Sequence, residues 1–229
     1  KKMSKSKGNV VTPMDLFETY GTDAVRYWSG SGRPGVDTAF SEDQMKVGRK
    51  LANKLLNVTK FVLQFGAPSG DTSLDDGVTD PIDRSMLAKL DAVIDEATAA
   101  FESFDYARAL ERTEAFFWWF CDNYVELVKG RTYDESRSEA ADSAKRALRT
   151  ALSTVQRLLA PILPFATEEA WSWWHDTSVH GAPWPTPLTA NGTFGDPGLV
   201  DVPIEVLTRV RRAKTEAKRS QRAAVDSLL

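Results

Sequence analysis

The sequence contains few of the residues that form disulfides and metal sites. One cysteine, Cys121, and two histidines, His175 and His180, occur among 229 residues. A single cysteine excludes an internal disulfide, and Cys121 lies within an aromatic run, so we expect a buried, unreactive thiol in a reducing compartment. Since neither histidine stands in a His/Cys cluster, we predict no metal site.

Long apolar runs are also missing. No run of about 18 apolar residues occurs, as a membrane-spanning helix would need, and no signal-peptide pattern opens the chain. Apolar residues nevertheless make up 42% of the sequence, which is enough for a sizeable core and one or two domains. We therefore expect a soluble, cytoplasmic protein with no membrane partner.

Charge is unevenly distributed along the chain, although the formal net charge is only −3. Residues 1–60 carry eleven Lys/Arg against six Asp/Glu, whereas residues 71–114 carry four against twelve. The stretch 205–226 is basic again, with seven against three. One face of such a protein can attract a polyanion while another repels it.

Helix start and stop signals recur along the chain and predict an all-α fold. Ser41 opens a capping box, Asp80 precedes a proline, and Asp105 precedes a helical pattern that we expect to end at Gly130. The predicted helices span 14–20, 22–28, 42–65, 81–103, 106–129, 139–160, 165–174 and 204–226, with loops over 66–80 and 175–203. Because four of the helices are long and follow one another through short or moderate loops, we expect an antiparallel helical bundle, preceded by a short loop and helical segment.

The helix predicted over 42–65 has two faces of different character. Apolar residues at helical spacing predict a core-facing stripe: Leu51, Leu55, Val58 and Val62. The other side carries amides, cations and one aromatic: Lys50, Asn53, Asn57, Lys60, Phe61 and Gln64. Two interpretations of this side remain open. It is either a solvated face on which Phe61 touches a neighbouring helix, or a surface that stacks on and hydrogen-bonds to unstacked RNA bases.

Two other helical stretches differ in how much protein should surround them. The run Phe116–Phe120 is aromatic on every side of its helix, which is typical of a helix enclosed by protein, so we expect it in the core rather than as a stacking platform. The basic helix predicted over 204–226 has only a narrow apolar seam, Val206, Val210 and Ala213. Exposure to solvent, pairing with another helix and contact with RNA all remain open for it.

The first residues bring cations and hydroxyls close together. Two lysines and two serines lie within five positions: Lys2, Ser4, Lys5 and Ser6. Gly8 lets the backbone approach a ligand closely, so phosphate is the expected ligand. A frayed basic terminus is the alternative. The order of residues 2–6, continued by residues 8–10 and a proline at 13, resembles the second signature motif of class I aminoacyl-tRNA synthetases.

The resemblance implies an ATP site. In this family the loop closes over ATP, which is bound with Mg²⁺, and the second lysine of the motif, here Lys5, stabilises charge on the phosphates as the carboxylate of the amino acid attacks the α-phosphorus. Lys5 is therefore the expected catalytic residue, since a compact ammonium is most effective where charge develops and water is excluded. The expected ATP-binding residues are Lys2, Met3, Ser4, Lys5 and Ser6.

Four later stretches resemble the valine-specific members of this family, namely residues 48–57, 119–129, 163–171 and 183–185. The resemblance implies that tRNA(Val), ATP and valine are partners of the whole enzyme, with no role for DNA, and that the bundle binds the anticodon region. The implied tRNA-binding residues are Asn53, Lys54, Asn57, Lys60 and Phe61. Phe61 would stack on an anticodon base, Asn57 would hydrogen-bond to a base edge or the backbone, and the two lysines would face phosphates.

The resemblance covers only part of such an enzyme. The sequence contains no His-Ile-Gly-His-type motif, nucleotide-binding αβ domain or inserted editing domain, so we expect a C-terminal portion that does not activate valine alone. The expected division is 1–40 for the phosphate loop and connecting helices, 41–185 for the anticodon-binding bundle, and 186–229 for a linker and the start of a basic arm. The alternatives are the same portion of an isoleucine, leucine or methionine enzyme, a free-standing tRNA-binding module without catalysis, and a purely structural helical scaffold.

Overall fold

The computed structural model describes residue 6 and residues 12–66, 77–133, 138–188, 195–225 and 227. No strand occurs among these residues, and the all-α prediction is confirmed. The helices are α1 (Pro13–Tyr20), α2 (Thr22–Gly30), α3 (Glu42–Leu63), α4 (Pro81–Glu102), α5 (Tyr106–Trp119), α6 (Val125–Thr132), α7 (Glu139–Leu159), α8 (Pro164–Ser172) and α9 (Asp201–Glu216), with a π-helical turn η2 (Phe120–Tyr124) and a 3₁₀ turn η3 (Val179–Gly181).

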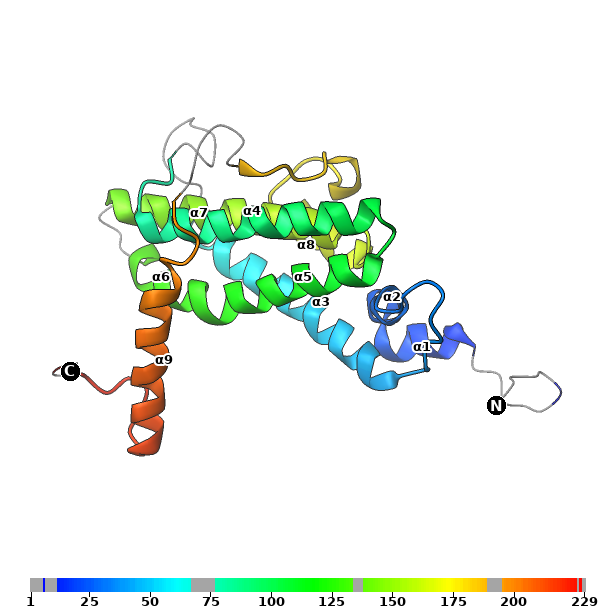
Figure 1. Ribbon diagram of the computed structural model, residues 1–229, viewed down its shortest axis with the longest axis horizontal. Helices are drawn as coiled ribbons and strands as arrows, with labels where there is room; N and C mark the ends of the chain where they lie inside the picture. The colour runs from blue at the N-terminus through cyan, green and yellow to red at the C-terminus, as the bar shows by residue number, and fades with distance from the viewer. Residues whose placement is uncertain are drawn as a thin grey trace.

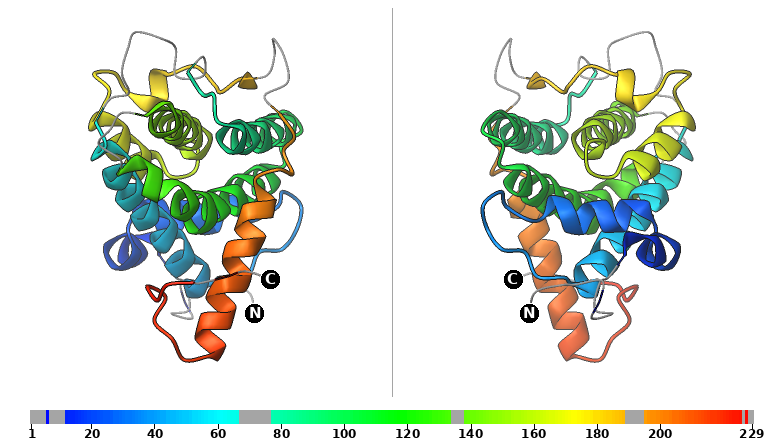
Figure 2. Two further views of the ribbon diagram at one scale, coloured as in Figure 1. Left: turned by 90° about the vertical axis from the view of Figure 1, so that its left-hand side faces the viewer. Right: turned by 90° about the vertical axis from the view of Figure 1, so that its right-hand side faces the viewer.

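The long helices form the predicted antiparallel bundle. In Figure 1, α4 and α7 lie alongside the rod made by α5 and α6, and α3 crosses the bundle obliquely. The end-on views in Figure 2 show that α1 and α2 lie at one end, whereas α9 projects away from the bundle. The bundle thus holds α3 against α2, α7 and α8. Exposed residues along α3, among them Asn53, Asn57 and Lys60, mark the side that the described helices leave uncovered.

Side-chain caps fix where the long helices begin. The Ser41 hydroxyl accepts from the Gln44 amide, and the carboxylates of Asp80 and Asp105 accept from amides in the first turns of α4 and α5. These bonds satisfy N–H groups that have no partner within the helix. At the other end of a helix, Gly21 terminates α1 with a φ of 88°, a conformation that favours glycine. The predicted starts and this predicted stop are confirmed.

The apolar stripe of α3 lies in the core, as predicted, and so do the three phenylalanines of the aromatic run, whereas Trp118 and Trp119 are half-buried against the core. Every residue of the stripe is buried: Leu51, Leu55, Val58 and Val62. Phe117 and Phe120 have no exposed surface, and Phe116 is 5% exposed. Cys121 follows directly in the same run, and its predicted burial is confirmed. Burial raises the pKa of its thiol to about 12, so we expect the thiol to be unreactive.

The helix predicted to end at Gly130 continues through it. α6 reaches Thr132 because Arg131, in its last turn, is bound to carboxylates of α4. The rod predicted over 106–129 is also interrupted by η2, a wider turn that rotates the residues following it. Tyr124, the last residue of η2, hydrogen-bonds to Asp83. Both departures therefore depend on partners that are distant in the sequence.

The C-terminal helix is shifted and shorter than predicted. It spans Asp201–Glu216 rather than 204–226. Pro203 lies in its first turn, where backbone N–H groups have no hydrogen-bond partner within the helix, so proline is tolerated there. Beyond the helix, Lys218 adopts a φ of 51° and the chain turns back. The Lys214 ammonium donates to the Gln221 carbonyl at 3.0 Å, which stabilises this return. The sequence pattern missed this stop because no glycine or proline marks it.

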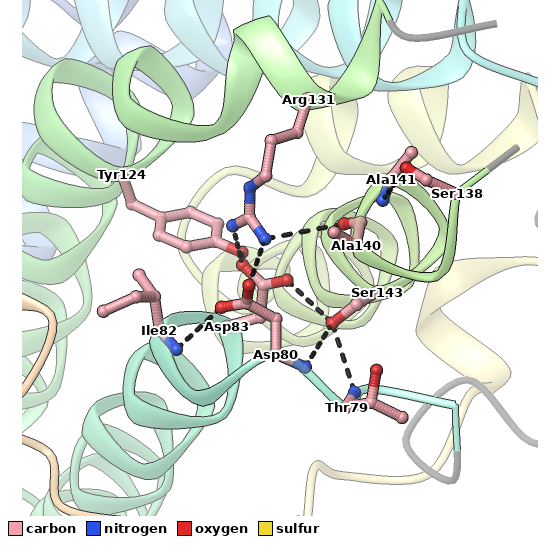
Figure 3. A network of polar contacts seen from close by, with 10 residues as sticks. All are labelled: Thr79, Asp80, Ile82, Asp83, Tyr124, Arg131, Ser138, Ala140, Ala141 and Ser143. Atoms are coloured by element: carbon pink, nitrogen blue, oxygen red, sulfur yellow. Dashed lines mark hydrogen bonds and ion pairs between the residues drawn. The ribbon is translucent and has the colours of Figure 1, made fainter. Parts of the chain in front are cut away.

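A buried polar network joins α4, α6 and α7 (Figure 3). The Asp83 carboxylate is fully buried and accepts from the hydroxyls of Tyr124 at 2.8 Å and Ser143 at 2.7 Å. Arg131 donates to Asp83 at 2.6 Å and to Asp80 at 2.7 Å. Burial raises the pKa of Asp83, an effect that the Arg131 charge opposes. Since each charge in the network has a partner, the penalty of burying an isolated ion is avoided.

Side chains of α2 tie the segment before α3 to the bundle. Asp23 of α2 accepts from the amides of residues 165 and 166, at 3.2 and 2.7 Å, and so caps α8. Arg26 donates to two carbonyls just before α8. A Cβ added to Gly48 would lie 2.5 Å from the Cβ of Tyr27, so glycine is needed where α2 crosses α3.

Candidate nucleic-acid interface

Four polar side chains line the uncovered side of α3. Asn53, Asn57, Lys60 and Gln64 are exposed, and their spacing of three and four positions places them on one side of the helix. We refer to these four residues as the α3 ridge. It offers amide donors and acceptors together with one cation, and it contains no acidic residue. These are the groups that contact base edges and phosphates.

Phe61 lies at the edge of the α3 ridge within an aromatic cluster. Its side chain is half-buried against the main core. The ring meets those of Phe65 and Tyr133 edge-on, with centroids 5.0 and 6.4 Å away. Tyr133, at the C-terminal end of α6, is 60% exposed. The cluster therefore presents a partly exposed aromatic surface beside the ridge, rather than one isolated ring.

Lys54 lies on the same edge of α3 and is already engaged. Its ammonium forms an ion pair with Asp122 at 2.9 Å and lies 5.7 Å from the ring centroid of Trp118. Partial burial lowers the pKa of Lys54, but the hydrogen bond to Asp122 and neighbouring acids outweigh that effect and raise it. Because Asp122 already balances its charge, Lys54 attracts a phosphate less strongly than an unpaired lysine would.

Lys60 differs from Lys54 because no carboxylate pairs with it among the described residues. Its ammonium lies 5.3 Å from the ring centroid of Trp173, just beyond α8. Lys60 is exposed, so this cation is available to an anionic ligand at the edge of the α3 ridge that faces α8.

Four of the five predicted RNA-contacting residues therefore lie along the uncovered side of α3 or at its edge: Asn53, Asn57, Lys60 and Phe61. The fifth, Lys54, forms an ion pair with Asp122. The sequence pattern did not identify two aromatic neighbours of Phe61, namely Phe65 and Tyr133. Phe65 stands four positions after Phe61, a spacing that could have revealed it. Tyr133 comes from another helix, and no local sequence signal connects it with α3.

The predicted phosphate-loop residues Lys2, Met3, Ser4 and Lys5 lie outside the described residues, whereas Ser6 is described and exposed. No group of three His, Cys, Asp or Glu side chains suited to a metal ion occurs within the described ranges. Across the same ranges, no helix has the length and apolar character needed to cross a membrane.

Family comparisons assign this architecture to a class of RNA-binding domain. Residues 83–229 match the model of the anticodon-binding domain of tRNA ligase, and residues 1–41 match that of class I tRNA synthetases for isoleucine, leucine, methionine and valine (I, L, M and V). The first match extends over more than half of the chain. The chain therefore belongs to the family of tRNA-ligase anticodon-binding domains.

The chain is most informatively compared with valine–tRNA ligases. It is 55% identical to that of Salinispora tropica over 100% of its own length, and 57% identical to that of Thermobifida fusca over 99%. It spans 28% and 26% of the length of these two relatives. Among solved structures, a LeuRS from Agrobacterium radiobacter K84, in a ternary complex with tRNA and LeuAMS, covers 82% of the chain with a TM-score of 0.61 and 22% identity. This likeness shows that the fold is shared.

Proposed function

We propose that the chain is the part of a valine–tRNA ligase that binds the anticodon arm of tRNA(Val). The observation that carries this proposal is the α3 ridge, where exposed amides and a cation lie beside a partly exposed aromatic cluster. High identity to valine–tRNA ligases along the whole chain supports valine over the isoleucine, leucine and methionine alternatives. The cytoplasm is the proposed compartment.

Each ridge residue has a proposed role. Asn53 and Asn57 hydrogen-bond to base edges or backbone, because an amide both donates and accepts. Phe61 offers the exposed part of its ring to an anticodon base, with Tyr133 extending the surface. Lys60 contacts a phosphate. Lys54 does so with a charge that Asp122 already balances, which makes it the weaker of the two cation contacts.

The opening residues are proposed to contact ATP, which binds together with Mg²⁺ in the whole ligase. Lys2, Met3, Ser4, Lys5 and Ser6 supply two ammoniums and two hydroxyls, a donor set suited to phosphate oxygens. Lys5 stabilises the charge that develops on the phosphates during activation of valine. In a ligase that contains this chain, Lys5→Ala should lower the rate of adenylate formation by about 10²-fold or more, with little change in valine affinity. A near-normal rate would contradict this role.

The division of the chain follows from these roles. We propose that residues 1–40 connect the ATP loop to the bundle, that residues 41–185 bind the anticodon arm, and that residues 186–229 begin a basic arm. The 229-residue chain alone should bind tRNA with strongly salt-dependent affinity and show no valine-dependent exchange of pyrophosphate into ATP. Detectable exchange by the purified chain would contradict this division of labour.

A matched pair of substitutions on α3 tests the proposal. Asn57→Ala removes an amide from the ridge and should weaken tRNA(Val) binding about 3- to 10-fold, as expected for loss of one hydrogen bond. Gln44→Ala removes an exposed amide at the other end of the same helix and should leave affinity unchanged. A tRNA with a substituted anticodon should bind the unmodified chain at least as weakly as tRNA(Val) binds Asn57→Ala, because it disturbs every base contact of the ridge. Equal affinity of both variants and both RNAs would reject the anticodon interface.

A further inference from the structure

Two arginines and two aromatic side chains lie together where α7 meets the end of α8. Arg149 and Arg157 are half-buried residues of α7, and Trp174 and His175 follow α8. We refer to these four residues as the α7–α8 patch. Neither the predicted ATP contacts nor the α3 ridge uses any of them, so their arrangement needs its own explanation.

Arg149 and Arg157 donate to backbone carbonyls and not to carboxylates, unlike Arg131, which pairs with Asp80 and Asp83. Arg149 donates to the Gly66 carbonyl at 2.7 Å, and its guanidinium carbon lies 5.6 Å from the ring centroid of Trp174. Arg157 donates to the carbonyls of Ser153 and Pro183, both at 3.2 Å. No acidic side chain pairs with either guanidinium in the part of the chain that the structure describes. Burial lowers the pKa of both, which marks the cost of enclosing unpaired charge.

Aromatic packing holds this arrangement in place. His175 stacks on Trp171, with centroids 3.7 Å apart and planes inclined by 16°, and lies 4.3 Å from the ring of Trp174. Burial and the nearby charges of Arg157 and Arg149 lower the pKa of His175, against a small opposing effect of Asp176. His175 is therefore neutral at pH 7, and the positive charge of the patch comes from its arginines.

The α7–α8 patch is continuous with the α3 ridge. Arg149 bonds to Gly66, just beyond the C-terminal end of α3, and stacks on Trp174. The adjacent Trp173 receives the Lys60 ammonium of the ridge over its ring. A ligand lying along the C-terminal half of the ridge can therefore reach the patch over Trp173, whose indole N–H donates to the exposed Glu169 carboxylate on the α8 side of this path.

We propose that the α7–α8 patch is a second RNA-binding surface, on which Arg149 and Arg157 bind phosphodiester groups of the RNA held at the α3 ridge. This inference rests on the proposed function. A guanidinium has five N–H donors, of which the described residues use one in Arg149 and two in Arg157, so each retains donors for phosphate oxygens. Eight residues separate the two arginines, or about 12 Å along the helix, which suits two phosphates of one backbone rather than a single free phosphate.

The salt dependence of tRNA(Val) binding tests this surface. Arg149→Gln and Arg157→Gln should each weaken binding about tenfold at low salt, and should each reduce the slope of log K against log salt concentration by about 0.7 to 0.9. Arg149→Lys retains the charge and should keep most of the slope. Arg112→Gln is the matched control, since it removes the same charge from an arginine that is already paired with Glu96.

The possible results separate the two proposals. Slopes for both patch variants equal to that of Arg112→Gln, with Asn57→Ala still weakened, would overturn the α7–α8 patch and leave the anticodon interface standing. Absence of tRNA binding by the unmodified chain would overturn both. If inorganic phosphate alone bound with the same sensitivity to Arg149→Gln, the patch would be a site for a free anion and not for an RNA backbone. Melting temperatures identify any variant that fails to fold. If Arg157→Gln does not fold, the slope of Arg149→Gln alone decides whether the patch binds RNA.

Discussion

Arg131 and the pair Arg149 and Arg157 are half-buried in the same bundle but have opposite surroundings. Arg131 donates to two carboxylates, one of them fully buried, whereas the other two arginines donate only to carbonyls within the described residues. A charge with an internal partner contributes to the fold, while a charge without one stays available for a ligand at some cost in stability. The comparison therefore distinguishes an arginine that is paired with carboxylates between helices from two arginines that we propose bind RNA.

Removing the ion pairs of Arg131 should have the largest effect on the free energy of unfolding. Arg131→Met leaves the Asp83 carboxylate buried without its cation, which should cost about 3 to 5 kcal/mol of unfolding free energy. Chemical denaturation measures this loss. The double variant Arg131→Met with Asp83→Leu removes both charges and should recover part of it. A single variant as stable as the unmodified chain would show that the network does not hold α4 and α6 together.

The half-buried Phe61 should affect both stability and RNA binding. Phe61→Ala should weaken tRNA(Val) binding by about 1 to 3 kcal/mol through lost stacking. Its cost in unfolding free energy should be below the roughly 3 to 5 kcal/mol of a fully buried phenylalanine. Phe61→Leu is the control, since it keeps most of the packing but loses the ring. A strongly destabilised Phe61→Ala variant with unchanged tRNA affinity would reject the anticodon role of Phe61.

Removing the unpaired arginines should hardly change stability. Arg149→Gln forfeits a bond to the Gly66 carbonyl and a contact with the Trp174 ring, and Arg157→Gln forfeits bonds to two backbone carbonyls. Each should change the unfolding free energy by about 1 kcal/mol. Denaturation curves recorded beside Arg131→Met give the comparison directly. If either variant lost as much stability as Arg131→Met, the distinction between the two kinds of arginine would fail.

The smallest effect is expected from protonation of His175. Its pKa in the folded protein is lowered below the ordinary value, chiefly by burial and then by Arg157 and Arg149. As pH falls through about 6.5, the unfolded state takes up this proton first, so stability should decrease from pH 7 towards pH 5. His175→Gln should flatten that part of the stability profile. An identical profile for the variant would show that His175 is not the responsible group.

The sequence predicted what depends on local pattern. Helix starts at Ser41, Asp80 and Asp105 follow from capping residues, and the buried stripe and exposed ridge of α3 follow from helical spacing. The roles of Lys2 to Ser6 in binding ATP, and of the ridge residues in binding tRNA, stay predictions. Residues 2–5 lie outside the described residues.

Features that depend on distant partners could not be predicted. The continuation of α6 past Gly130 rests on the bonds of Arg131 to α4, and the engagement of Lys54 rests on Asp122, 68 positions away. The α7–α8 patch likewise requires α7, α8 and the end of α3 to meet. Spacing along one helix contains no information about which other helix faces it.

Footprinting of tRNA(Val) with the 229-residue chain tests the central claim most directly. Hydroxyl-radical cleavage of the RNA backbone should show protection in the anticodon arm. Asn57→Ala should weaken protection in the anticodon loop, and Arg149→Gln should weaken it at neighbouring backbone positions. Protection that was absent, or that lay outside the anticodon arm and was unchanged by both substitutions, would contradict an RNA interface built from the α3 ridge and the α7–α8 patch.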